Sequence, residues 1–439
     1  MELGGKRVIV VGLGKSGLSA ARLCQRRGAR VLGTDVQPAE KLPKELGGAG
    51  LELVLGGHAG VDFSAADLIV VSPGVPPLPE LARAERAGVP VIGEMELAAR
   101  LIGAPIVAIG GTNGKSTTTT LVARMLEATG KRIFAGANLG APACDAVEGG
   151  FDVVVFEVSS FQLERAPKFS PKVSVLLNIS EDHLDRYSSY QEYANAKGNA
   201  FANQGEEDSA VVPAGDAACL AQARRGRGKL STFGAGGDYE VRGRQVIERA
   251  SGESFSLVGV DLHGRHNLDN AAAAIAAVRA LGVAPEAIAA GLGAFHPLHH
   301  RMALVRALGG VHFYDDSKGT NVGAAVTALA GLEEPKAVLI AGGRDKLGSY
   351  GPLVDALEKK GRAVVVIGEA ASRIADAVGA RVPVARAASM AEAVRVARSL
   401  AEPGDAVLLS PACSSYDMFV DYVDRGNQFA AAVSALEEA

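Results

Sequence analysis

The sequence has no tryptophan and few cysteines, four in 439 residues. These lie far apart and form no Cys-x-x-Cys pair, which argues against a disulfide framework and a cysteine-based zinc cluster: Cys24, Cys144, Cys219 and Cys413. No apolar run is long enough to span a bilayer, and no signal-peptide pattern precedes the first strand-like run. We therefore expect a cytoplasmic protein with no membrane partner.

An excess of basic residues is also missing. The chain has 45 lysine and arginine residues against 49 aspartate and glutamate residues, a net charge of −4 and a pI near 6.1. The basic residues are scattered, so a nucleic-acid partner is disfavoured. We expect small-molecule substrates and a monomer.

The chain has ample apolar residues, 48% of the total, and its length predicts two or three domains. Strand-length apolar runs alternate with helical patterns, which predicts an α/β fold with mostly parallel sheets. Three blocks follow: a dinucleotide-binding-like domain at residues 1–93, a central P-loop domain at 94–298, and a doubly wound, Rossmann-like domain at 299–439. A glycine-rich, strand-like stretch at 204–264 predicts an antiparallel insertion.

A phosphate-binding loop follows the apolar run at residues 105–109. Glycines let backbone N–H groups approach phosphate oxygens, Lys115 adds a positive charge, and Ser116 supplies a hydroxyl ligand for Mg²⁺. Gly110 lies one residue too close to the Gly-Lys pair for the general pattern, so this is a shortened variant. ATP or GTP is the predicted ligand of Gly111, Thr112, Asn113, Gly114, Lys115, Ser116 and Thr117.

A second glycine-rich turn follows the first strand and resembles the dinucleotide fingerprint. It comprises Gly12, Leu13, Gly14, Lys15 and Ser16 and ends at Gly17, with Asp35 at the end of the next strand. Taken alone, this pattern predicts an NAD-linked oxidoreductase. The same geometry binds any pyrophosphate, so the ligand stays open between NAD and another nucleotide.

Polar residues also follow two buried strands in the central block. Glu157 ends one of them, where a carboxylate beside a phosphate loop is placed to bind Mg²⁺. The cluster at residues 178–187 follows the next strand and includes His183. Buried polar clusters are costly unless they serve a site. Lys197, on the helical stretch after this cluster, is by itself expected to be a surface lysine.

Several motifs together resemble the Mur ligase family of cytoplasmic, amide-forming enzymes of bacterial cell-wall synthesis. They are Gly-Thr-Asn-Gly-Lys-Ser-Thr-Thr at residues 111–118, Ser-Ser-Phe-Gln-Leu at 159–163, Gly-x-His-Asn-x-x-Asn-x-x-Ala at 264–273, and Asp-Ser-Lys-Gly-Thr-Asn at 316–321. The resemblance covers the whole chain. It implies an ATP-dependent, Mg²⁺-requiring acid–amino-acid ligase.

The resemblance also implies roles for residues whose spacing alone assigns none. Lys115, His183, Lys197 and Lys318 would be catalytic, with Lys197 carbamylated by CO₂. The metal ligands would be Ser116, Glu157, His183 and Lys197. ATP would also be held by Asn267, His300, Arg301 and Asp316.

The first domain would hold the UDP of a muramoyl substrate instead of NAD. Ser72 and Gly74 would form a second loop on that substrate, beside the turn at residues 12–16 and Asp35, and Asn138 would approach it from the central domain. The incoming amino acid would be bound by Thr320, Lys346, Ser415 and Tyr422.

Within the family, Asn113 disfavours the L-alanine-adding member, which usually carries His there. The dinucleotide-like first domain and the lack of an Asp-Asn-Pro-Arg stretch disfavour the two later ligases. The member that adds D-glutamate to UDP-N-acetylmuramoyl-L-alanine is favoured. Another ligase of the family, an NAD-linked oxidoreductase and a P-loop switch protein remain as alternatives.

Overall fold

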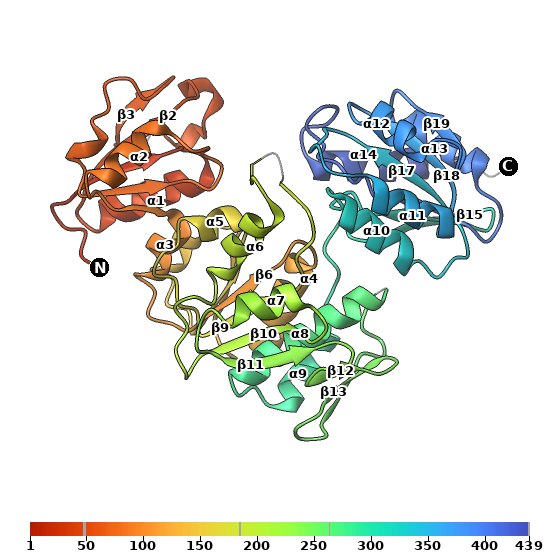
Figure 1. Cartoon of the computed structure of the whole chain (residues 1–439), viewed down its shortest axis with the longest axis horizontal. Coiled ribbons are helices and arrows are strands. Elements are labelled where there is room, and N and C mark those ends of the chain that lie inside the picture. The colour runs from red at the N-terminus through yellow and green to blue at the C-terminus, as the bar shows by residue number, and fades with distance from the viewer. Residues whose placement is uncertain (47–49, 184–185, 263, 438–439) are drawn as a thin grey trace.

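The computed structural model describes residues 1–46, 50–183, 186–262 and 264–437. Leu184 and Asp185, two members of the predicted polar cluster, lie outside the described residues. The chain forms three α/β domains, each built on its own sheet, and the first and last stand on opposite sides of the central one (Figure 1). None of the helices in the described part is long and apolar enough to cross a membrane.

The first domain has a five-stranded parallel sheet of order β3-β2-β1-β4-β5. Its strands are β1 (Arg7–Val11), β2 (Arg30–Asp35), β3 (Glu52–Leu55), β4 (Leu68–Val71) and β5 (Val91–Gly93). Its helices are α1 (Lys15–Arg26) and α2 (Pro79–Arg86), with 3₁₀ turns η1 (Ala39–Lys41), η2 (Lys44–Leu46) and η3 (Phe63–Ala65). The predicted parallel α/β domain is confirmed.

The central sheet has nine strands, in the order β14-β13-β12-β11-β10-β9-β6-β8-β7. They are β6 (Ile106–Gly110), β7 (Ile133–Ala137), β8 (Val153–Glu157), β9 (Val173–Leu176), β10 (Ser209–Pro213), β11 (Lys229–Phe233), β12 (Tyr239–Val241), β13 (Gln245–Glu248) and β14 (Ser254–Ser256). The helices are α3 (Glu94–Ala99), α4 (Lys115–Glu127), η4 (Ala143–Ala146), α5 (Ser160–Glu164), α6 (Tyr190–Gly198), α7 (Ala217–Ala223), α8 (Arg265–Ala280) and α9 (Pro285–Gly293).

The antiparallel stretch is shorter than the sequence predicts. Among the described strands of the central sheet, only the β12–β13 and β13–β14 pairs are antiparallel, whereas β10, β11 and the β11–β12 pair extend the parallel sheet. The crossover between β10 and β11 is α7, whose N-cap Asp216 accepts a hydrogen bond from the Cys219 N–H. This helix has only seven residues, too few to show a clear helical period in the sequence.

The last domain has a six-stranded sheet of order β15-β16-β20-β17-β18-β19, in which only β15 is antiparallel to its neighbour. The strands are β15 (Ala303–Leu308), β16 (Val311–Asp315), β17 (Ala337–Gly342), β18 (Gly361–Ile367), β19 (Val384–Arg386) and β20 (Ala406–Leu409). The helices are α10 (Val322–Gly331), α11 (Gly351–Lys360), α12 (Ala371–Val378), α13 (Met390–Leu400) and α14 (Tyr422–Ser434). Because β16, β20 and β17 are adjacent and parallel, the loops that follow them meet at one edge.

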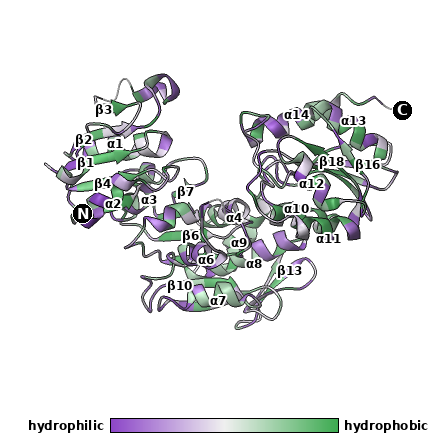
Figure 2. Cartoon of the chain, turned by 45° about the horizontal axis from the view of Figure 1, so that its top comes forward, coloured by the Kyte–Doolittle hydropathy of each residue, from purple (hydrophilic) through white to green (hydrophobic). Residues whose placement is uncertain are grey.

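The strands are mainly hydrophobic and are covered by helices of mixed character (Figure 2). One cluster of buried apolar side chains runs from the first domain into the central one, where α3 and η4 meet. The last domain has its own clusters on the two faces of its sheet. It is therefore the domain with the more independent core.

Glu94, the first residue of α3, is a buried carboxyl at the junction of the first two domains. Its Oε1 accepts a hydrogen bond from the Cys144 N–H at 2.6 Å, while Oε2 has no partner within the described chain. Burial raises the pKa of Glu94 to about 7. The folded protein therefore binds an extra proton in a pH range where the unfolded chain has lost it.

Replacing Glu94 with glutamine should flatten the pH dependence of stability. Because the folded pKa lies above the unfolded value, wild-type stability falls as pH rises from about 4.5 to about 7. A Glu94→Gln protein keeps an oxygen for Cys144 and should be more stable above pH 7, by up to about 3 kcal/mol. Thermal unfolding of both proteins at pH 5 and pH 8 measures this difference in stability. An equal loss of stability between the two pH values in the wild-type and Glu94→Gln proteins would contradict the prediction.

Candidate functional site

The phosphate loop joins β6 to α4 and depends on Gly114. This residue has a φ of +84°, which favours glycine, and an added Cβ would lie 2.4 Å from Asn270 Oδ1. The N-terminus of α4 thus opens onto a cavity of about 250 Å³. Helix N-termini carry partial positive charge, and this one is placed to receive phosphate.

Lys115 folds back over this loop. Its Nζ donates to the carbonyl oxygens of Gly111 at 3.0 Å and Thr112 at 2.8 Å. Burial lowers the pKa of Lys115, and the nearby carboxylates of Glu157 and Asp182 partly oppose that shift. The Lys115 ammonium thus lies on the phosphate loop, with two carboxylates near it.

Many of the predicted site residues line the 250 Å³ cavity together. They come from loops that lie as much as 234 positions apart in the chain: Thr112, Asn113, Gly114, Lys115, Ser116, Thr117, Asn138, Glu157, His183, Asn267, Arg301, Asp316, Lys318, Thr320 and Lys346. Arg301 comes from the start of the last domain and donates to Ser116 Oγ at 2.7 Å. The structure therefore gathers most of the predicted ATP and metal residues of two domains, but Gly111, His300 and Lys197 are not part of the cavity lining.

Glu157 has the character of a ligand for a hard cation. It ends β8, is buried, and accepts a hydrogen bond from Asn138 Nδ2 at 2.5 Å through Oε1. Its Oε2 has no hydrogen-bond partner within the described residues. Nowhere in the described ranges do three or more His, Cys, Asp or Glu side chains form a metal cluster. A divalent cation here would need further oxygens from a phosphate ligand, as Mg²⁺ sites usually do.

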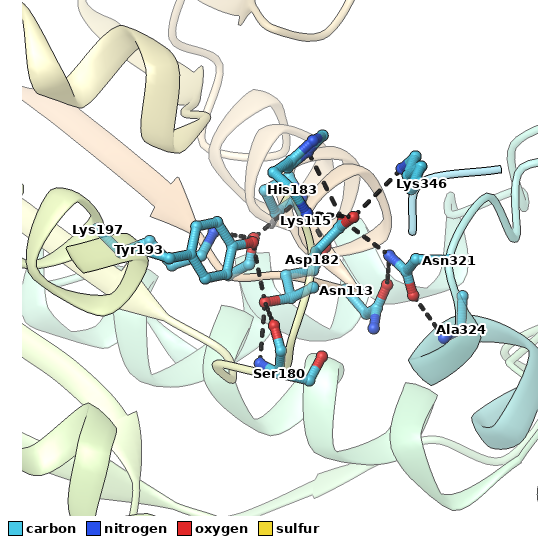
Figure 3. A network of polar contacts seen from close by, with 12 residues as sticks. Asn113, Lys115, Ser180, Asp182, His183, Tyr193, Lys197, Asn321, Ala324 and Lys346 are labelled. Atoms are coloured by element: carbon cyan, nitrogen blue, oxygen red, sulfur yellow. Dashed lines mark hydrogen bonds and ion pairs between the residues drawn. The ribbon is translucent and has the colours of Figure 1, made fainter. Parts of the chain in front are cut away.

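Lys197 is buried, so the expectation of a surface lysine is wrong. It is 3% exposed, and its Nζ donates to the Gly111 carbonyl at 2.9 Å above the ring of Tyr193 (Figure 3). Burial, and then the charge of Lys115, hold the pKa of Lys197 well below its usual range. The sequence did not predict this burial because it comes from the packing of α6 behind the phosphate loop.

The loop after β16 lies beside the phosphate loop. Lys318 Nζ sits 3.9 Å from the centre of the Tyr422 ring, and burial lowers the pKa of Lys318 to about 8. Asp316 accepts a hydrogen bond from Ser410 Oγ at 2.7 Å, and burial raises its pKa to about 7. His300 hydrogen bonds to Asp315 Oδ2 at 2.6 Å, outside the cavity lining.

The four predicted amino-acid ligands are only partly gathered. Thr320 and Lys346 line the 250 Å³ cavity, but neither Ser415 nor Tyr422 lines it. Ser415 is buried in the loop after β20, and Tyr422 packs under Lys318. Lys346 also lines an adjoining, largely apolar cavity of about 220 Å³, together with Val322, Val326 and Tyr350.

Two residues of this region were quoted in motifs but given no role from the sequence. Asp182 accepts from Lys346 Nζ at 3.2 Å, and Asn321 Nδ2 donates to Asp182 Oδ2 at 3.2 Å and Asn113 Oδ1 at 3.1 Å (Figure 3). Burial raises the pKa of Asp182, but the charges of Lys346 and His183 outweigh it and leave the pKa low. The polar motifs in the sequence indicated that this region belongs to a site. The hydrogen-bond partners of Asp182 and Asn321 are known only from the fold.

The glycine-rich turn of the first domain is a separate, tightly built loop. Gly12 has a φ of +83°, and a Cβ at Gly17 would lie 1.7 Å from the Gly12 oxygen. Asp35 accepts from the Leu13 N–H at 2.6 Å and the Gln37 N–H at 2.8 Å. Asp35 therefore fixes the glycine-rich turn through Oδ2, while Oδ1 bonds the segment that follows β2.

Ser72 supports the same turn from the end of β4. Its Oγ donates to the Gly12 carbonyl at 2.7 Å. By contrast, apart from the adjoining chain, no described residue lies within 4 Å of a Cβ built on Gly14 or Gly74. Lys15 and Ser16 open α1. None of these residues reaches the phosphate-loop cavity, and of the UDP-site predictions only Asn138 lines it.

Three family models match the chain in order. They are the Mur ligase MurD-like N-terminal domain over residues 6–93, the Mur ligase middle domain over 109–278, and the Mur ligase glutamate ligase domain over 300–413. A UDP-N-acetylmuramoylalanine–D-glutamate ligase from Geobacter metallireducens is 46% identical over 99% of this chain and 99% of its own length. The chain belongs to the Mur ligase family. A protein of the same name from Anaeromyxobacter dehalogenans is 46% identical over 98% of this chain and 97% of its own.

Solved structures of Mur ligases share the fold. A pseudomurein peptide ligase type C from Methanothermus fervidus superposes with a TM-score of 0.63, at 18% identity, over 98% of this chain and 100% of its own. UDP-N-acetylmuramate-alanine ligase from Thermotoga maritima superposes with a TM-score of 0.62, at 22% identity, over 98% of this chain and 99% of its own. Mur ligases use ATP to form amide bonds, which agrees with a phosphate loop at the centre of the cavity.

Proposed function

We propose that this chain is an ATP-dependent ligase that joins D-glutamate to UDP-N-acetylmuramoyl-L-alanine in peptidoglycan precursor synthesis. The observation that carries this is full-length identity of 43–46% to curated ligases of that name. The site supports it, because a phosphate loop, a carboxylate and several cations from two domains line one cavity. The nucleotide substrates favour a cytoplasmic enzyme, and one chain supplies every proposed ligand, which favours a monomer.

The reaction needs an activated carboxylate, since a carboxylate does not accept an amine at neutral pH. In the proposed path a carboxylate oxygen attacks the γ-phosphorus of ATP, giving an acyl phosphate and ADP. The D-glutamate amine then attacks the carbonyl carbon, and phosphate leaves as the amide forms. Phosphoryl transfer depends mainly on positioning and charge neutralisation, which Lys115, Lys318 and Arg301 are placed to supply.

Mg²⁺ would be held by Ser116, Glu157, His183 and the carbamate on Lys197. The unpartnered oxygen of Glu157 supports this assignment. When bound, Mg²⁺ neutralises charge on the phosphate oxygens. A neutral amine at Lys197, favoured by its burial, is the form that adds CO₂, so the structure is compatible with the proposed carbamate.

The domains would divide the substrates between them. We assign residues 1–93 to the UDP-linked substrate, 94–298 to ATP, and 299–439 to D-glutamate. Asn267, His300, Arg301 and Asp316 would complete the ATP site, and Lys346 with Thr320, Ser415 and Tyr422 would hold the amino acid. Turnover then requires the domains to close, with hinges near Gly93 and residues 298–299.

The nucleotide preference of the first domain separates this function from an NAD-linked oxidoreductase. A valine at Gly14 meets open space in the protein, so it should block an approaching pyrophosphate and leave the fold intact. Calorimetry should show heat from the UDP-linked substrate with the wild-type protein and none with Gly14→Val. Saturable NAD binding that Gly14→Val abolishes would overturn the assignment of this domain.

A further inference from the structure

Asp182 joins the central domain to the last one through a carboxylate. Its Oδ1 lies 3.2 Å from Lys346 Nζ, and its Oδ2 accepts from Asn321 Nδ2 at 3.2 Å (Figure 3). Lys346 follows β17 and Asn321 precedes α10, so one acid holds two loops of the last domain. The contact is largely shielded from water, since the Asp182 side chain is 8% exposed.

The same lysine is the proposed ligand for a carboxylate of D-glutamate. Lys346 lines both cavities and keeps 22% of its side chain exposed, so a small anion can reach it. Asp182 presents to Lys346 the same chemical group that the amino acid would present. Two carboxylates beside one ammonium repel each other, so they compete for it.

Asp182 can release Lys346 without becoming an isolated buried charge. The charge of Lys115 also lowers the pKa of Asp182, and His183 Nε2 lies 3.7 Å from Asp182 Oδ2. Asn321 can stay in place, because its Oδ1 caps α10 at Ala324 and its Nδ2 also donates to Asn113 of the phosphate loop. Only the contact between Asp182 and Lys346 needs to be replaced, by one between Lys346 and the amino acid.

We propose that Asp182 is an internal competitor that occupies Lys346 until a carboxylate of the amino acid displaces it. Asp182 thereby sets the affinity of the site for its amino acid. This rests on the proposed function, in which Lys346 binds that carboxylate. Before the amino acid arrives, the same contact holds the last domain against the central one.

Calorimetric titration with D-glutamate tests the proposal, with the UDP-linked substrate and a non-hydrolysable ATP analogue present. Asp182→Asn is nearly isosteric and removes the competing charge, so D-glutamate should bind about tenfold tighter or more, as expected for loss of a charge-assisted contact. Asp182→Ala removes the competitor entirely and should act in the same direction. Lys346→Met breaks the same contact but should weaken binding at least tenfold.

Glu181→Gln is the matched control. Glu181 is exposed and lines the 220 Å³ cavity but not the phosphate-loop cavity. Its replacement by Gln changes the net charge as much as Asp182→Asn does, so the affinity for D-glutamate should stay within about twofold. Unchanged or weaker binding in both Asp182 variants would overturn the competitor role. Unchanged binding in Lys346→Met would instead overturn the proposed amino-acid site, which separates the two failures.

Discussion

Replacing Lys115 with alanine is expected to abolish ATP-dependent amide formation and leave the fold intact. The Lys115 ammonium stands on the phosphate loop within the cavity that gathers the other cations. Loss of a charge on the transferring phosphoryl group should cost several kcal/mol, a reduction of about a hundredfold or more in rate. Steady-state phosphate release from ATP, compared between the wild-type and Lys115→Ala proteins, measures this reduction in rate.

The fold should tolerate this change because removing the Lys115 ammonium also removes the cost of burying its charge, which offsets the loss of its two hydrogen bonds. The unfolding temperature should therefore stay close to that of the wild-type protein. Lys131→Ala is a suitable control, since Lys131 is exposed just beyond the far end of α4. Near-normal turnover by a folded Lys115→Ala protein would show that the phosphate loop has been wrongly assigned.

Lys197→Ala should have very low activity that rises when acetate or formate is added. A carbamate on Lys197 would supply an oxygen ligand for Mg²⁺, which a protonated amine cannot, since it has no acceptor. The small acid would enter the space left by the buried side chain and replace that oxygen in part. Turnover measured against carboxylic-acid concentration gives the rescue curve.

The wild-type enzyme should also lose activity when CO₂ and bicarbonate are removed. Lys131→Ala should show no response to acetate, because its side chain is exposed and remote from the loop. Full activity of Lys197→Ala in bicarbonate-free buffer would exclude both the carbamate and a catalytic role for this lysine.

Local patterns predicted the parts of the site that are built from one strand and the turn after it. The phosphate loop between β6 and α4, and Glu157 at the end of β8, lie where the sequence put them. Each depends on a few adjacent residues and on the rule that polar loops gather at the carboxyl ends of parallel strands. The α/β fold class could be predicted for the same reason, because it depends on local strand and helix patterns that alternate along the chain.

Contacts between distant segments could not be predicted in this way. Asp182 and Lys346 are 164 positions apart, and their pairing depends on how two domains meet. The burial of Lys197 likewise depends on α6 packing behind the phosphate loop, which no period in the sequence reports. The position of the Tyr422 ring under Lys318 depends on α14 returning to the loop after β16.

The central claim is the identity of the bond that this enzyme forms. The most direct test is phosphate release from ATP, measured with UDP-N-acetylmuramoyl-L-alanine and each of several amino acids in turn. We predict rapid release with D-glutamate and background release with L-glutamate, L-alanine and diaminopimelate. Release that depends on any other amino acid, or none with D-glutamate, would contradict the account.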